Sequence, residues 1–270
     1  MSPQPSNHPR VTPGSRVTNE PPGTLDVLAI GAHPDDIELS CGGTLALLVQ
    51  AGRRVGILHL TRGEASTRGN VEMRAAEADA AAVALGVTTV EYLDCGDGAL
   101  RTALEEENAL IQVIRRLRPE LILGPPGSDR HPDHGRAARL VSDACYYAGL
   151  AKRGPGEPHR PAANFSYMQY DAFEPSFIVD VTSTWEAKLE ALAAYRSQLY
   201  QPDLLPKANE MRNEPMTKVA SEDYRAAVEG RARHYGLLIG ATFGEPFASR
   251  LPLAVADPWS LLPRVATELR

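Results

Sequence analysis

The sequence lacks any apolar run that approaches the roughly 20 residues of a membrane-spanning helix. Its first 23 residues are rich in Pro, Ser, Asn and Thr, and they lack the apolar stretch of a secretory signal. A segment of this composition cannot bury enough apolar surface to fold, so we expect a disordered tail over residues 1–23. Neither membrane insertion nor secretion is predicted.

The sequence also has no surplus of basic residues. It carries 28 Lys and Arg against 34 Asp and Glu, a formal net charge of −6 at pH 7 and a pI near 5.7. A nucleic-acid-binding domain normally presents a basic face, so we expect neither nucleic acid nor an anionic membrane as a partner. The only cysteines are Cys41, Cys95 and Cys145, which we interpret as core or helix residues. Their small and odd number argues against a disulfide framework and predicts a cytoplasmic location.

What the chain does contain is an alternation of strand-like and helix-like segments after residue 23. Apolar runs predict strands, and Ala-rich or amphipathic stretches that end at Gly or Pro predict helices. The expected strands cover residues 25–31, 55–60, 89–93, 121–123, 164–169 and 176–181. The expected helices cover residues 41–52, 71–85, 105–118, 136–149, 184–199 and 221–234, with irregular chain at 61–70 and 201–216.

This order of elements predicts an α/β fold, in which a parallel sheet carries helices on both faces. The regularity weakens after residue 151, where we expect a C-terminal α+β extension. With 270 residues, 43% of them hydrophobic, the chain can form a substantial core. No linker or internal repeat follows the tail, so residues 24–270 are predicted to form a single domain.

Two strings rich in His and Asp each follow a predicted strand. The first, AHPDD, covers residues 32–36, and the second, DRHPDHG, covers residues 129–135. In open α/β sheets, ligands bind just past the carboxyl ends of the strands. Two such strand ends would face one shared cleft. This arrangement is typical of a metal-dependent hydrolase.

Three residues of these strings form a candidate metal site. His33 and Asp36 lie three residues apart, with Pro34 between them to fix the local backbone. This spacing can bring both side chains to one point, and His134 can complete a set of three. Two imidazoles, one carboxylate and an open position form a recurrent catalytic zinc site. Zinc lowers the pKa of a water at the open position to about 7. The same donors also accept iron, cobalt or nickel.

The other residues of the strings suit acid–base and electrostatic roles. Asp35 is placed to take a proton from the bound water and to pass one to a leaving amine. His131 can stabilise a developing oxyanion, and Asp133 can orient His131 and stabilise its charge. His59 lies inside a predicted strand and is interpreted as a core histidine.

These strings resemble the signature of a known family, the LmbE-like or PIG-L-like zinc-dependent N-deacetylases. That family has a (P/A)HPDD string after its first strand and an HPDH string about a hundred residues later, as residues 32–36 and 131–134 do here. Other segments are similar to the branch that deacetylates N-acetylglucosaminyl malate in bacillithiol synthesis. They are residues 60–70 with Arg74, Glu77 and Ala78, residues 195–198, and residues 231–236. The resemblance covers about residues 25–250.

The resemblance implies a Rossmann-like form of the sheet and a role for each residue of the two strings. It implies that Zn²⁺, or another divalent metal such as Fe²⁺, is held by His33, Asp36 and His134. It also implies that Asp35 is the general base and that His131, with Asp133 behind it, is the electrostatic partner. Family members of this branch are homo-oligomers, so a hexamer or trimer is expected.

The resemblance further implies three residues around the substrate. Arg74 matches an arginine that holds sugar hydroxyls, and a solvated helix arginine is the equal alternative. Tyr224 matches a mobile tyrosine that helps to polarise the acetyl carbonyl. Arg130 is placed to meet a substrate carboxylate such as that of malate.

The predicted function is thus removal of acetyl from a small N-acetylglucosaminyl substrate, with N-acetyl-α-D-glucosaminyl L-malate as the first choice. A mycothiol-type conjugate or a chitooligosaccharide is the alternative amide. A nucleotide-binding oxidoreductase would need a Gly-rich turn after the first strand, where this chain has carboxylates that repel a pyrophosphate. A non-catalytic metal- or sugar-binding protein is the remaining class, although every acid, base and ligand position is present.

Overall fold

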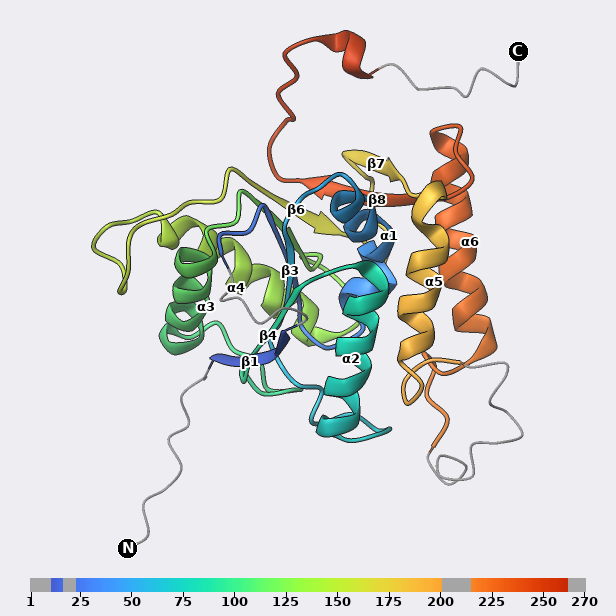
Figure 1. Cartoon of the computed structure of the whole chain (residues 1–270), viewed down its shortest axis with the longest axis horizontal. Coiled ribbons are helices and arrows are strands. Elements are labelled where there is room, and N and C mark those ends of the chain that lie inside the picture. Colours follow the sequence, from blue (N-terminus) through green and yellow to red (C-terminus); the bar gives the residue numbers. More distant parts are fainter. Residues whose placement is uncertain (1–10, 17–22, 201–214, 262–270) are drawn as a thin grey trace, which may run out of the picture.

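A computed structural model describes residues 11–16, 23–200 and 215–261, and its centre is a mixed sheet (Figure 1). Over these residues the sheet has eight strands in the order β1-β4-β3-β2-β5-β6-β8-β7. The strands are β1 Val11–Arg16, β2 Val27–Gly31, β3 Val55–His59, β4 Thr89–Leu93, β5 Leu121–Gly124, β6 Ala163–Tyr167, β7 Phe177–Asp180 and β8 Gly244–Ser249.

Helices cover both faces of the sheet. They are α1 Asp36–Gln50, α2 Val71–Leu85, α3 Leu104–Leu117, α4 Pro132–Ala148, α5 Trp185–Ala194 and α6 Glu222–Leu238, with short 3₁₀ turns at η1 Thr182–Thr184 and η3 Pro258–Leu261. Helices α3 and α4 pack together over one core cluster, and α1, α2 and α5 pack over the other (Figure 1). The predicted α/β class is therefore confirmed. None of the helices in the described part of the chain is long and apolar enough to cross a bilayer.

The central strands pair in parallel, and the helices that connect them bury both faces of the sheet. Every residue of β2, β3 and β4 is buried, which suits the near-continuous apolar sequence of these strands. Strand β2 pairs with β3 on one side and with β5 on the other, with Val27 opposite both Val55 and Leu121. Successive strands are therefore added on one side of β2 up to β4 and on its other side from β5 onward. Such a switch point is where open α/β sheets bind their ligands.

The sheet departs from the predicted parallel arrangement at both edges. Strand β1 runs antiparallel to β4, and β8 runs antiparallel to both β6 and β7. The expectation of disorder over residues 1–23 therefore does not hold at 11–16, while 1–10 and 17–22 lie outside the described residues. Strand β8 was not predicted, because Gly244 and Pro246 are residues that normally argue against a strand.

Several predicted boundaries also shift. Helices α1 and α4 begin at Asp36 and Pro132, before the expected 41 and 136, so the His/Asp strings run directly into helices. Helix α5 ends at Ala194, before the expected 199. Most of the irregular stretch predicted at 201–216 lies outside the described residues.

A buried carboxylate supports α1 beside the first string. The helix is interrupted at Cys41, whose φ of −136° and ψ of 22° are not helical. Glu245 of β8 accepts hydrogen bonds from the amides of Gly43 and Thr44, at 3.0 and 2.7 Å, and so caps the second part of the helix. Lys188 of α5 donates to the same carboxylate at 2.5 Å, and both side chains are only 2% exposed. This ion pair ties α1, α5 and β8 together.

Candidate active site

The two His/Asp strings line one cavity at the switch point, as the strand-end argument predicts. The first string follows β2 and leads into α1, and the second follows β5 and leads into α4. Asp35 and His131 occupy the N-cap positions of these two helices. The neighbouring strands thus deliver both strings to the same place although a hundred residues separate them.

Three imidazoles and one carboxylate meet on the floor of this cavity. Ring nitrogens of His33, His131 and His134 all lie within 4.8 Å of one another. Asp36 lies between two of these rings, with Oδ2 3.4 Å from His33 Nδ1 and Oδ1 3.3 Å from His134 Nε2. The predicted ligands His33, Asp36 and His134 are therefore together. Gln169, which follows β6, donates to Asp36 Oδ1 at 2.6 Å.

The hydrogen bonds of the rings distinguish their roles. His134 Nδ1 lies 2.8 Å from Asp129 Oδ1, and an ionised carboxylate only accepts, so Nδ1 carries a proton and, in the neutral ring, Nε2 keeps its lone pair. His131 Nδ1 instead accepts from the amide of Asp133 at 3.2 Å. In neutral His131 the proton therefore sits on Nε2, which makes this nitrogen a donor. His134 is thus set up as a metal ligand and His131 as a hydrogen-bond donor.

The donor set fits a divalent cation. All three predicted ligand side chains are buried, and the Asp97 carboxylate lies 3.0 Å from His33 Nε2. Two imidazoles and a carboxylate are ligands that zinc and iron accept. Asp129 holds His134 as carboxylates hold ligating histidines in metal sites, which fixes the ring orientation.

Asp35 is held in a strained conformation next to this donor set. Its φ of 97° is in the left-handed region, which is unfavourable for a residue with a Cβ. Burial raises the pKa of Asp35 to about 6, against the opposing charge of Arg74. Arg74 Nη2 lies 3.4 Å from Asp35 Oδ2 and also donates to the Pro34 carbonyl. The Arg74 side chain is 5% exposed, which rules out the solvated alternative. It passes beneath Gly63, leaving no room there for a Cβ.

Asp133 differs from its predicted position. Its carboxylate accepts from the Gly98 amide at 2.8 Å and from Arg136 at 3.0 Å, and it lies 3.6 Å from His33 Nε2. Burial alone would raise the pKa of Asp133, but these hydrogen bonds hold it at about 2. Only its backbone amide bonds to His131. The carboxylate therefore does not orient the His131 ring as predicted, because the second residue of α4 turns its side chain toward the loop that follows β4.

The remaining predicted residues lie at the mouth of the cavity. Tyr224, near the start of α6, faces Tyr170 with ring centroids 6.5 Å apart. Burial raises the pKa of Tyr224 to about 12. Arg130 is exposed, and its guanidinium lies 4.5 Å from the Tyr170 ring centroid. Both line the cavity with Arg74.

Several residues that line the cavity were not predicted as site residues. Asp97 Oδ1 lies 3.0 Å from His33 Nε2, and Asp129, Gln169 and Arg231 also line the cavity. Asp97 and Gln169 each follow a strand, so the strand-end rule that selected the two strings would also have selected them.

Comparisons with known proteins identify the family. A family model described as PIG-L, GlcNAc-PI de-N-acetylase, matches residues 28–145. A diacetylchitobiose deacetylase from Thermococcus kodakarensis is 33% identical over 189 residues, which cover 64% of this chain and 69% of that protein. The chain belongs to the PIG-L family.

Two further matches cover a larger share of the related protein's length. A crystal structure of a conserved Thermus thermophilus protein shares 37% identity and a TM-score of 0.78, covering 87% of this chain and 99% of that one. A 1D-myo-inositol 2-acetamido-2-deoxy-α-D-glucopyranoside deacetylase from Catenulispora acidiphila is 30% identical, covering 64% of this chain and 79% of that protein. This PIG-L protein is therefore an amide hydrolase, as predicted. The bacillithiol branch is not among these relatives and stays a prediction.

Proposed function

We propose that this PIG-L protein removes acetyl from the 2-acetamido group of a small N-acetylglucosamine conjugate. The observation that carries the proposal is that the two rings His134 and His131, near Asp36, make different hydrogen bonds. His134 offers a lone pair to a metal, while His131 offers a proton to a substrate oxygen in the same cavity. Named deacetylases of N-acetylglucosamine-type compounds among the relatives support this choice of substrate.

His33, Asp36 and His134 would hold the cation, with Zn²⁺ as the first choice and Fe²⁺ as the alternative. When bound, such a cation supplies Lewis acidity and lowers the pKa of a water to about 7. Asp129 and Gln169 position the ligands, because they hydrogen-bond to His134 and Asp36.

Asp35 moves the proton in the proposed reaction. Its carboxylate takes a proton from the water whose oxygen forms the new bond to the acetyl carbon. It then gives a proton to the amide nitrogen as the C–N bond breaks, so that acetate and a free amine leave. Arg74 holds Asp35 in the required conformation and is a positioning residue in this scheme.

The carbonyl oxygen becomes negative during this attack. His131 donates a hydrogen bond to it from Nε2, which stabilises charge that is present only in the transition state. Tyr224 at the cavity mouth is the proposed second donor to the carbonyl. Asp133 contributes by ordering His33 and the start of α4.

The aglycone is proposed to be malate, as in bacillithiol synthesis. Arg130 is exposed beside the cavity, and a guanidinium pairs with a carboxylate in a bidentate manner. Arg74 also lines the cavity and is the proposed contact for a sugar hydroxyl. A mycothiol-type conjugate or a chitooligosaccharide is the alternative substrate, and a homo-oligomer remains our expectation.

Acetate release tests the proposal. The zinc-loaded protein is incubated with N-acetylglucosaminyl malate, N-acetylglucosaminyl inositol and diacetylchitobiose, with and without chelator. We expect chelator-sensitive release from at least one sugar and the highest kcat/KM for the malate conjugate. Asp35→Asn should keep the metal and lose turnover. Release at the wild-type rate by Asp35→Asn would exclude the mechanism, and no release from any sugar would exclude the function.

A further inference from the structure

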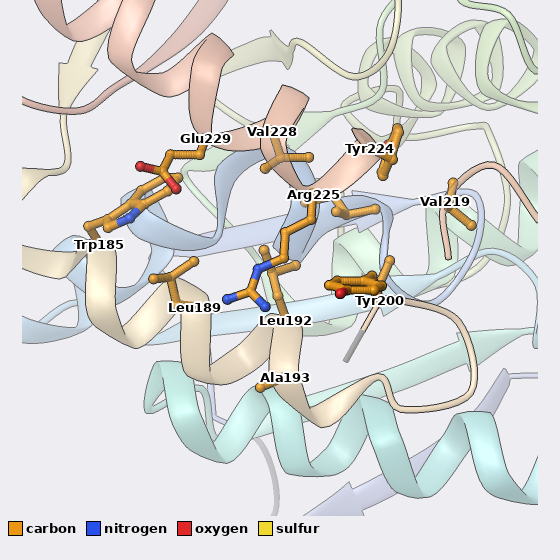
Figure 2. Close-up of a pocket in the computed structure, with 12 residues that line it drawn as sticks. Trp185, Leu189, Leu192, Ala193, Tyr200, Val219, Tyr224, Arg225, Val228 and Glu229 are labelled. Carbon is orange, nitrogen blue, oxygen red and sulfur yellow. The ribbon is translucent and has the colours of Figure 1, made fainter. Parts of the chain in front are cut away.

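An apolar groove lies between α5 and α6, next to the catalytic cavity (Figure 2). Helix α5 contributes Trp185, Leu189 and Leu192 to the groove, and Val228 of α6 lies opposite them. Figure 2 shows these side chains directed into the space between the two helices, with Arg225 reaching across from α6. None of the proposed metal ligands lines this groove.

The groove adjoins the catalytic cavity. Leu39, Val219 and Tyr224 line both spaces, so the groove and the cavity meet at these three side chains. Leu39 is in the first helical turn after Asp35, and residues four apart in a helix lie on the same face. The apolar wall therefore begins directly beside the proposed general base.

The cavity lining includes both polar and apolar residues. Ser66, Thr67, Asp97 and Gln198 can pair with sugar hydroxyls. Leu39 and Val219, which the cavity shares with the groove, can pair with none. A glucosaminyl amide that pairs its sugar with the polar residues and its acyl carbon with the shared apolar residues directs its acyl chain toward the groove.

We infer that this groove is a subsite for an unbranched acyl chain, so that the enzyme hydrolyses N-acyl glucosaminides with chains longer than acetyl. The inference rests on the proposed amide hydrolysis and extends it to another class of substrate. The reaction consumes one water, breaks the same C–N bond and releases a longer carboxylate with the free amine. Burial of each additional methylene strengthens binding by about fourfold.

Binding can be tested without turnover through the fluorescence of Trp185. The chain has two tryptophans, and the other one, Trp259, is 76% exposed. A zinc-loaded Asp35→Asn, Trp259→Phe protein therefore reports on the groove alone. We expect methyl N-hexanoylglucosaminide to change the emission saturably and to bind at least tenfold more tightly than methyl N-acetylglucosaminide. Equal binding of the two compounds, or no change in emission, overturns the subsite.

Groove-filling variants give the matched turnover test. Leu189→Trp adds bulk inside the groove, and Glu190→Trp adds the same bulk at the next, exposed position of α5. We expect Leu189→Trp to lower the kcat/KM ratio of N-hexanoyl to N-acetyl substrate at least tenfold, and Glu190→Trp to leave it unchanged. An unaltered ratio in Leu189→Trp contradicts the inference.

Further outcomes distinguish a failure of the acyl subsite from a failure of the proposed function. Preference for octyl N-acetylglucosaminide over the N-hexanoyl compound would assign the groove to an apolar aglycone, and would overturn the acyl assignment. Hydrolysis of N-acetyl substrates with no gain for longer chains overturns the subsite alone. Loss of all hydrolysis with intact N-hexanoyl binding counts against the proposed function and supports the subsite.

Discussion

Replacement of Gly63 by alanine should inactivate the enzyme although Gly63 does not contact the donor set. An ideal Cβ at this position lies 2.5 Å from Arg74 Cζ, whereas ordinary contact begins at 3.4 Å. The guanidinium must therefore retreat by about 0.9 Å, which breaks its contacts with Asp35 and the Pro34 carbonyl. A misplacement of about 1 Å in a catalytic group costs on the order of 100-fold in rate. We expect kcat to fall by about that factor.

Gly52→Ala is the matched control for this prediction. Gly52 has a φ of 78°, close to the 68° of Gly63, but a Cβ there meets nothing within 4 Å. Both variants pay the left-handed backbone cost of about 1–2 kcal/mol, so both unfolding free energies should fall by about that amount, and that of Gly63→Ala should fall further because of the clash. Acetate-release kinetics and denaturant unfolding are measured on both. Wild-type kcat in Gly63→Ala, or an equal loss of kcat in Gly52→Ala, would refute the positioning of Asp35 through Arg74.

The remaining predictions concern the metal, the core and acid stability. Asp129→Asn should weaken zinc binding by about 10–100-fold in a competition titration, because the neutral amide no longer raises the basicity of His134 and its NH2 group faces the backbone amides of Tyr170 and Asp171; unchanged affinity would reject this contact. Lys188→Met should cost about 3–5 kcal/mol in urea unfolding, since it leaves Glu245 buried without its partner, and a loss below 1 kcal/mol would argue against it. Burial lowers the pKa of His59 to about 3, so the unfolded chain takes up that proton first. Stability should then fall as the pH drops from 6.5 toward 3, and His59→Leu should flatten this part of the profile; identical profiles would contradict the argument.

The sequence predicts the centre of the sheet better than its edges. Strands β2 to β5 are short apolar runs bounded by turn residues, and burial on both faces leaves such runs one stable arrangement. Strands β1 and β8 carry Pro and Gly, and they are strands because distant partners supply their hydrogen bonds. Long-range pairing of that kind leaves no local pattern to read.

The same contrast holds for the site. His33 and His134 are predictable because each sits at a strand end beside carboxylates. The contact of Asp129 with His134, and the turn of the Asp133 carboxylate away from His131, depend on side-chain directions at the start of α4. The spacing of residues along the chain predicts which residues lie in the site. It does not predict which side-chain atoms contact one another.

Zinc titration of the metal-free protein, followed by acetate release, tests the central claim most directly. Activity should rise in proportion to added zinc and reach its plateau at one ion per chain. His134→Ala should give no rise at the same concentrations. Full activity without metal, or an unchanged titration in His134→Ala, would contradict the account.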